Sequence, residues 1–107
     1  MKLITKEIQT AAHRQYPQGA DMTTQMIVAK FFDPCGSWSW YLMNLDPSDN
    51  DYCWGIVKGD EVEAGSFSLS ELQAHRGPVG LGIERDKFFE PLPAAEVWER
   101  LNGGQHI

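Results

Sequence analysis

"WSWYLMNLDPSDNDYCWGIVKGDEVEAGSF", residues 38–67, contains three runs of residues that are typical of strands, at 38–45, 52–58 and 62–67. Each run carries β-branched or aromatic side chains. Two groups of turn-forming residues separate the runs, at 46–51 and at Gly59-Asp60. Connections this short join antiparallel neighbours. The segment therefore predicts three consecutive antiparallel strands, and these decide the fold.

A fourth strand is expected before this segment. Residues 26–32, MIVAKFF, are β-branched and aromatic, and residues 33–37, DPCGS, supply the turn that follows them. Alternation along 38–45 gives two faces, with Trp38, Trp40 and Leu42 on one and Ser39, Tyr41 and Met43 on the other. Because both faces carry large side chains, we expect 38–45 to be an inner strand of a four-stranded antiparallel meander.

Helices are expected at both ends of the chain. Thr5 is a typical N-cap for a first helix, which Pro17 and Gly19 end. A last helix is expected from Pro93 to Asn102, with apolar residues on one side and an ion pair of spacing i,i+4 on the other. Residues 104–107 are expected to form a frayed tail.

A short helix is expected directly after the fourth strand. Ser68 and Glu71 form an S-x-x-E capping box at the start of 69–76, and Gly77 stands where a left-handed C-cap belongs. The whole pattern predicts an α+β fold in one domain, residues 1–107. Its parts are an N-terminal helix, a four-stranded antiparallel meander sheet, and two C-terminal helices joined by a long ordered loop.

Composition restricts the compartment and the cofactors. The apolar runs are too short for a membrane span and the start of the chain lacks a secretory signal, so we expect a cytoplasmic protein without membrane contact. Cys35 and Cys53 fit neither a CxxC motif nor a disulfide framework, which indicates free thiols. The three histidines lie far apart in the sequence, so we expect no metal and no cofactor.

Charge indicates the kind of partner. A net charge of −6 argues against direct binding of nucleic acid, which needs clustered Lys and Arg, but permits a basic protein partner. Most of the charge falls in 46–63, where six acidic residues stand against Lys58 alone. We predict a binding surface made of these acidic residues and two strand aromatics: Asp46, Asp49, Asp51, Asp60, Glu61, Glu63, Trp38 and Tyr52. The alternatives are solvated turns for the acidic residues and core packing for the aromatics.

Residues 76–91, RGPVGLGIERDKFFEP, contain the other candidate site residues. In one interpretation they form a structural clasp, in which arginines and carboxylates hold the loop in place: Arg76, Glu84, Arg85, Asp86 and Glu90. In the other they form a small catalytic or ligand-binding site together with the preceding histidine: Glu84, Arg85, Asp86 and His75. The glycines and prolines that fix the loop favour the clasp, which assigns no catalytic residue.

The sequence resembles the bacterial DUF2958 family over most of its length. The resemblance rests on GSFSLSELQAHRGPVGLGIERDKFFEP at 65–91, on KFFDPCGSWSWY at 30–41 and on the opening MKLITKE. The chain departs from the family pattern at Ser66, where an aromatic residue is usual. Members are small proteins common on plasmids and other mobile elements, and the family name records an unknown function. The resemblance therefore implies no catalytic residues, but it implies a helper, regulatory or anti-defence role.

We accordingly predict a non-catalytic, acidic accessory module of a mobile element. Its expected partner is a basic protein, of the kind that handles nucleic acid or acts in defence. Two alternatives stay open. One is a small enzyme or ligand-binding protein centred on the second set of loop residues, and the other is a structural homodimer that uses a sheet edge or face.

Overall fold

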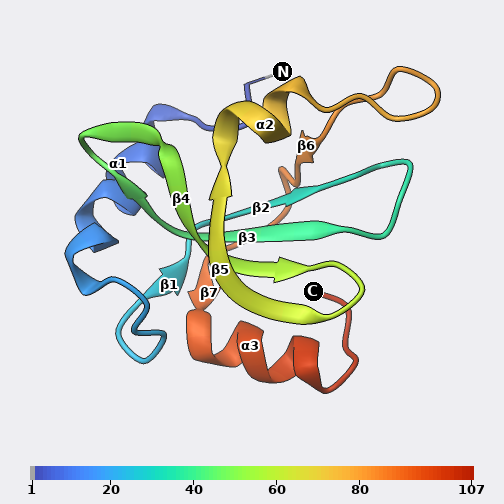
Figure 1. Cartoon of the computed structure of the whole chain (residues 1–107). Helices are drawn as coiled ribbons and strands as arrows, with labels where there is room; N and C mark the ends of the chain where they lie inside the picture. Colours follow the sequence, from blue (N-terminus) through green and yellow to red (C-terminus); the bar gives the residue numbers. More distant parts are fainter. Residues whose placement is uncertain (1) are drawn as a thin grey trace.

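The computed structural model describes residues 2–107, and a five-stranded antiparallel sheet forms its centre (Figure 1). The strand order is β5-β4-β3-β2-β6. The strands are β2 (Ala29–Phe32), β3 (Ser39–Asp46), β4 (Asp49–Lys58), β5 (Val62–Ser68) and β6 (Glu84–Arg85). The α+β class and the antiparallel meander are confirmed, whereas the expected count of four strands is wrong. Met1, the first residue of the expected domain, lies outside the described residues.

The additional strand, β6, lies in the segment that joins the two C-terminal helices. Arg85 pairs with Phe31 and Glu84 with Phe32, which extends the sheet beyond β2. The same segment also supplies β7 (Leu92–Pro93), which pairs with β1 (Met26–Ile27) in a separate two-stranded sheet. Strands of two residues have no periodicity to detect, so the sequence predicted a loop here.

The inner position of β3 agrees with its two apolar faces. A register shift between Leu42 and Asn44 places a β-bulge at Met43, opposite β4. Gly55 is required beside this bulge, because a Cβ atom there would lie 1.9 Å from the carbonyl oxygen of Tyr41. The turn after β3 is only Pro47-Ser48, since the following residues, expected in the turn, belong to β4.

Three α-helices accompany the sheet in the described chain: α1 (Lys6–Gln15), α2 (Leu69–Ala74) and α3 (Ala94–Asn102), with a 3₁₀ turn at Tyr16–Gln18 after α1. Thr5 and Ser68 cap α1 and α2 as predicted, because each side chain accepts a hydrogen bond from a backbone N–H of the first turn. The expected end of α2 is wrong, since the left-handed glycine of this region is Gly80 and not Gly77. Gly80 is the last residue of a turn that begins at Gly77, and its N–H closes the turn by donating a hydrogen bond to the carbonyl of Gly77.

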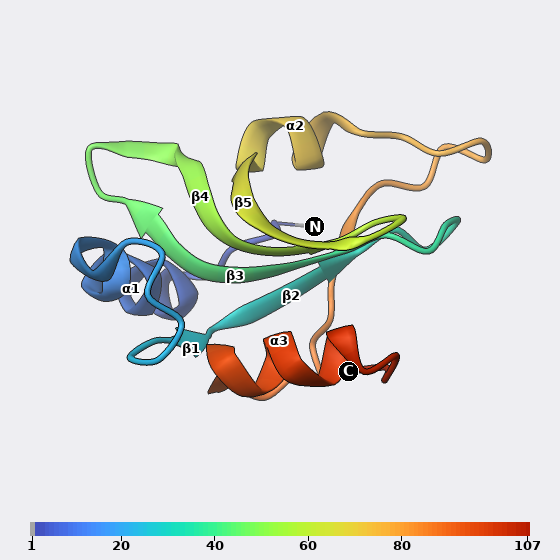
Figure 2. The ribbon, with the colours of Figure 1, turned by 60° about the horizontal axis from the view of Figure 1, so that its bottom comes forward.

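Two apolar clusters cover the two faces of the sheet. One packs α1 and α2 against the face of Phe31 and Leu42, and the other packs α3 against the face of Tyr41 and Ile56. Figure 2 shows α2 above and α3 below the strands. The tail is not frayed as expected, because the backbone oxygen of Ile107 accepts hydrogen bonds from Lys30 Nζ and Tyr41 Oη.

Candidate functional site

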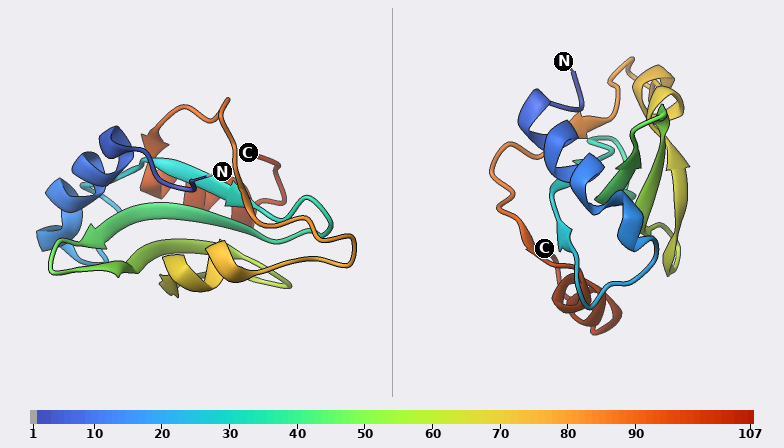
Figure 3. Two further views of the ribbon diagram at one scale, coloured as in Figure 1. Left: turned by 90° about the horizontal axis from the view of Figure 1, so that it is seen from above. Right: turned by 90° about the vertical axis from the view of Figure 1, so that its left-hand side faces the viewer.

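The acidic residues of 46–63 occupy two places on the molecule. Asp46 pairs with Asp49 at one end of β4, and Lys58 pairs with Val62 at the other end. The ten residues of β4 separate the two turns by about 30 Å. The left panel of Figure 3 shows the β3–β4 turn at one end of the sheet, and Figure 1 shows the β4–β5 turn at the opposite end. The acidic residues of the expected binding surface therefore form two groups at opposite ends of the sheet.

Carboxylates at the β3–β4 turn are bonded within the chain. Asp46 accepts hydrogen bonds from the backbone N–H and the hydroxyl of Ser48, at 2.9 and 2.8 Å, and one from the hydroxyl of Tyr16. Asp51 accepts from the Ser68 hydroxyl at 2.6 Å and from the backbone N–H of Ser70. The serine hydroxyls and amides stabilise the ionised form and lower the pKa of Asp46 and of Asp51. These two aspartates fasten the turn and the start of α2.

Carboxylates at the β4–β5 turn are free. Among the described residues, no side-chain hydrogen bond or ion pair involves Asp60, Glu61 or Glu63. They line a pocket of about 340 Å³ whose remaining wall includes Trp38. Trp38 is 42% exposed and packs on Gly59, where a Cβ atom would lie 2.6 Å from the indole ring. The turn therefore presents an indole and three carboxylates together.

Three pockets that share lining residues each include part of the edge strand β5, and the second of them also reaches across the face of the sheet to Asp33 and Ile83. The pocket beside the β4–β5 turn shares Trp38 with a second pocket of about 500 Å³. This second pocket shares Phe67, Ser68 and Glu71 with a third, of about 310 Å³, that reaches Asp49, Asp51 and Tyr52. We call the three together the β5 groove. The groove contains every residue of the expected binding surface except Asp46.

The β5 groove combines carboxylates with aromatic rings. Its lining includes seven carboxylates: Asp33, Asp49, Asp51, Asp60, Glu61, Glu63 and Glu71. Its aromatic side chains are Trp38, Trp40, Tyr52 and Phe67, and the rings of the two tryptophans are 6.1 Å apart and tilted by 40°. No Lys or Arg belongs to this lining in the described chain. The groove is thus suited to a cationic ligand, which carboxylates and ring faces both attract.

One edge of β5 is open. β4 is the only strand that pairs with β5 in the described chain, so the backbone groups on the other side of β5 have no strand partner. Gly65, at the middle of the strand, has no atom within 4 Å of where a Cβ would lie. Because strand side chains point off the faces of the sheet, the sheet face is uncovered at this point.

Side chains of the expected clasp contact mainly backbone. Arg85 donates hydrogen bonds to the carbonyl oxygens of Lys2 and Leu3, at 2.9 and 3.3 Å, and so ties β6 to the N-terminal segment. Arg76 donates to the carbonyls of Gln73 and His75 at the end of α2. Both arginines point to the protein's own backbone.

Carboxylates of the same loop form no ion pair with Arg76 or Arg85 in the described chain, although Glu84 lines the same pocket as Arg76. Asp86 accepts from the backbone N–H of Phe88 at 2.9 Å and lies 3.9 Å from Lys30 Nζ. Glu84 lines a pocket of about 340 Å³, while Glu90 is exposed. No ion pair joins Glu84 or Glu90 to an arginine among residues 2–107.

The residues of the alternative catalytic set are dispersed. His75 lies in the β5 groove, where its Nε2 is 3.7 Å from Asp33 Oδ2, whereas Glu84 lines a different pocket. Arg85 and Asp86 are engaged by backbone groups. The histidine is therefore close to an aspartate that the sequence interpretation did not consider.

The cysteines, the potential metal ligands and the helices define the other chemical properties of the described chain. Both cysteines are free, and burial raises the pKa of the Cys53 thiol to about 12, which keeps it protonated. Within residues 2–107 no three potential ligands are grouped closely enough to hold a metal ion. In the same range no helix has the length and apolar character that crossing a bilayer requires.

Sequence reasoning missed part of the groove. The sequence predicts a turn at Asp33, a helix cap at Glu71 and a strand at Phe67, and no local pattern joins the three in one site. Asp33, Phe67 and Glu71 come together only when β5 pairs with β4 and α2 packs against the sheet. Alternation places Glu63 and Phe67 on one face of β5, which is the signal that was available.

Comparison with known proteins leaves the site without a named ligand. A family model described as "Protein of unknown function (DUF2958)" matches residues 3–103. No curated protein and no solved structure matches the chain. Because the family model covers nearly the whole sequence, the chain belongs to the DUF2958 family.

Proposed function

We propose that this protein is a non-catalytic binding module that holds an extended, basic segment of a partner protein along strand β5. The observation that carries the proposal is the β5 groove, whose described lining contains seven carboxylates, with Asp60, Glu61 and Glu63 unbonded, and no Lys or Arg. A surface of one sign steers an oppositely charged partner and excludes like-charged ones.

The shape of the groove supports an extended ligand. Each of the three pockets is lined in part by residues of β5, so a chain in β conformation that runs beside this strand can contact all three. Its backbone can pair with the open side of β5, as in recognition by strand addition, while its cationic side chains reach the carboxylates. Trp38 supplies a ring face for one Lys or Arg.

The proposal extends to the class of partner. Proteins that bind nucleic acid carry clustered Lys and Arg. A basic segment held in the groove is withdrawn from nucleic acid, which suits an accessory module that regulates a nucleic-acid-handling or defence protein. Membership of a family common on plasmids agrees with such a role in a mobile element. The two free thiols agree with a cytoplasmic location.

Titration with a designed peptide tests this function. A ten-residue peptide of alternating Arg and Ala places its cationic side chains on one face of an extended chain, and the matched peptide has Glu in place of Arg. We expect calorimetry to detect binding of the Arg peptide alone, with affinity that falls as salt rises. Reversal of three charges, with Asp60→Lys, Glu61→Lys and Glu63→Lys, is expected to weaken binding at least about tenfold.

A second triple variant controls for net charge. Glu7→Lys, Glu90→Lys and Glu99→Lys remove the same charge from exposed residues outside the groove. This control should retain affinity within about threefold, because screened charges at a distance contribute little. Equal losses in the two triple variants would show attraction by net charge alone, and absence of binding to the Arg peptide would contradict the function directly.

A further inference from the structure

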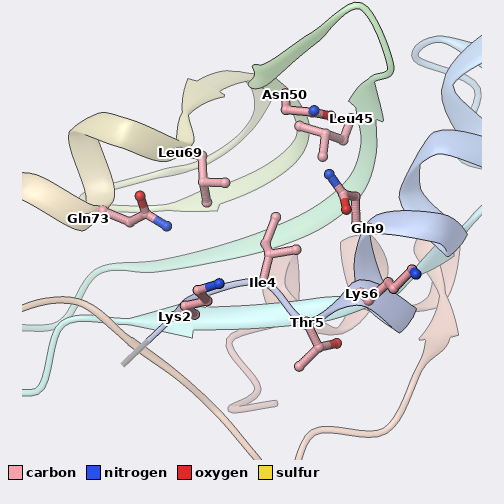
Figure 4. A pocket seen from close by; sticks show the side chains of 9 residues that line it. All are labelled: Lys2, Ile4, Thr5, Lys6, Gln9, Leu45, Asn50, Leu69 and Gln73. Atoms are coloured by element: carbon pink, nitrogen blue, oxygen red, sulfur yellow. The ribbon is translucent and has the colours of Figure 1, made fainter.

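A pocket with the opposite charge lies between α1 and α2, on the same face of the sheet (Figure 4). Its volume is about 670 Å³, within the range of small-molecule sites. Leu69 and Gln73 of α2 line this pocket, whereas Glu71 and Leu72 of the same helix line the β5 groove. The short helix therefore separates two sites of different chemistry.

The polar part of this pocket includes several hydrogen-bond donors. Lys2 and Lys6 line it, and neither forms an ion pair with a carboxylate among the described residues. Three amide side chains accompany them: Gln9, Asn50 and Gln73. The Oδ1 atom of Asn50 lies 2.6 Å from His13 Nε2, which leaves the Nδ2 group as a donor for a ligand. In a chain of net charge −6, this pocket has two positive charges and no acidic residue in its described lining.

The rest of the pocket is apolar. Ile4, Leu45 and Leu69 line it as well, and Figure 4 shows Ile4 near the centre of the lining side chains. A small inorganic ion would leave this surface uncovered. A ligand with an organic body, in contrast, removes it from water while its charged group meets the donors.

We propose that this pocket binds a small organic phosphate, a phosphate monoester about the size of a mononucleotide. A phosphate monoester carries a charge of about −1.5 to −2 at neutral pH and three acceptor oxygens. Its charge suits the basic lining and the amide donors better than that of a carboxylate, because a carboxylate has a single charge. The site goes beyond the proposed function, since it shares no lining residue with the β5 groove.

Titration of the ¹⁵N-labelled protein with adenosine monophosphate tests the proposal. We expect saturable shifts of the side-chain amide signals of Gln9, Asn50 and Gln73. Gln73→Glu keeps the shape of the side chain but adds a negative charge inside the pocket, and it should weaken binding at least about tenfold. Lys6→Gln should weaken binding severalfold, whereas Lys87→Gln, an exposed lysine outside the pocket, should leave affinity unchanged.

Adenosine and inorganic phosphate distinguish the two parts of the ligand. The proposal requires both to bind more weakly than adenosine monophosphate. If adenosine bound as tightly as adenosine monophosphate, the phosphate group would contribute nothing to binding. If inorganic phosphate bound as tightly, the organic part of the ligand would contribute nothing. Absence of shifts at millimolar adenosine monophosphate, or unchanged affinity in Gln73→Glu, would overturn the proposal and leave the function of the β5 groove untouched.

Discussion

The two turns at the ends of β4 have similar acidic composition but different roles. At the β3–β4 turn, Asp46 and Asp51 accept hydrogen bonds from nearby serine hydroxyls and amides, and thereby hold the backbone. At the β4–β5 turn, Asp60, Glu61 and Glu63 surround the exposed Trp38 with no bond of their own among the described residues. The difference shows that local donors, and not charge density, decide whether a carboxylate is structural or available to a partner.

The largest expected effect comes from the strand that keeps the two turns apart. Gly55→Ala should destabilise the protein by about 3 kcal/mol or more, because the new Cβ would overlap the carbonyl oxygen of Tyr41 at the β-bulge. Its cross-strand partner Gly65 has open space, so Gly65→Ala should be neutral or stabilise by up to about 1 kcal/mol. Urea unfolding measures both, and similar values for the two variants would contradict the register described for β4.

The next effect concerns Trp38 without any change of charge. Gly59→Ala should displace the indole ring, which lies 2.6 Å from the added Cβ, and weaken binding of the Arg peptide about tenfold. Trp38→Ala should have the same effect, and the double variant should add nothing to either single change. If calorimetry showed that the losses of affinity in the two single variants add up in the double variant, Gly59 would affect binding independently of Trp38.

A smaller effect is expected from the structural turn. Asp51→Asn replaces the charged acceptor of the Ser68 hydroxyl and the Ser70 amide, so the melting temperature should fall. Asp60→Asn removes the same charge where no hydrogen bond depends on it, and its melting temperature should equal that of the parent. An equal fall of the melting temperature in Asp60→Asn would contradict the different roles of the two turns.

The smallest effect is a change in acid stability. The pKa of Asp46 and of Asp51 is lowered in the folded state from the ordinary value of 3.8. As the pH falls through that value, the unfolded chain therefore binds more protons than the folded protein does. The stability that these groups contribute is present above that value and is lost as pH falls toward the folded pKa. Unfolding measured between about pH 5 and pH 2 should therefore show a shallower pH dependence in Asp51→Asn, and an unchanged slope would contradict this assignment.

Much of the fold follows from local sequence signals. The meander, the inner position of β3 and the helix caps at Thr5 and Ser68 are all encoded within a few neighbouring residues. In contrast, β6 and β7 are two residues long and exist only through partners distant in sequence. Their pairing depends on tertiary contacts that no periodicity records.

The candidate site divides in the same way. Trp38 and the acidic residues from Asp49 to Glu63 were singled out from composition and turn position, and they line the β5 groove. Asp33 and His75 meet at 3.7 Å although 42 positions separate them, so their contribution depended on the folded structure. Sequence predicted the charge of the surface, whereas only the fold reveals its course along β5.

Mapping the Arg peptide onto the ¹⁵N-labelled protein tests the central claim most directly. We predict shifts of the backbone amides of β5, of the Trp38 indole N–H and of the β4–β5 turn, with Ser48 and the signals of α3 unchanged. A saturating peptide that shifts α3 or residues 84–90 in place of β5, or that shifts no signal, would contradict the account.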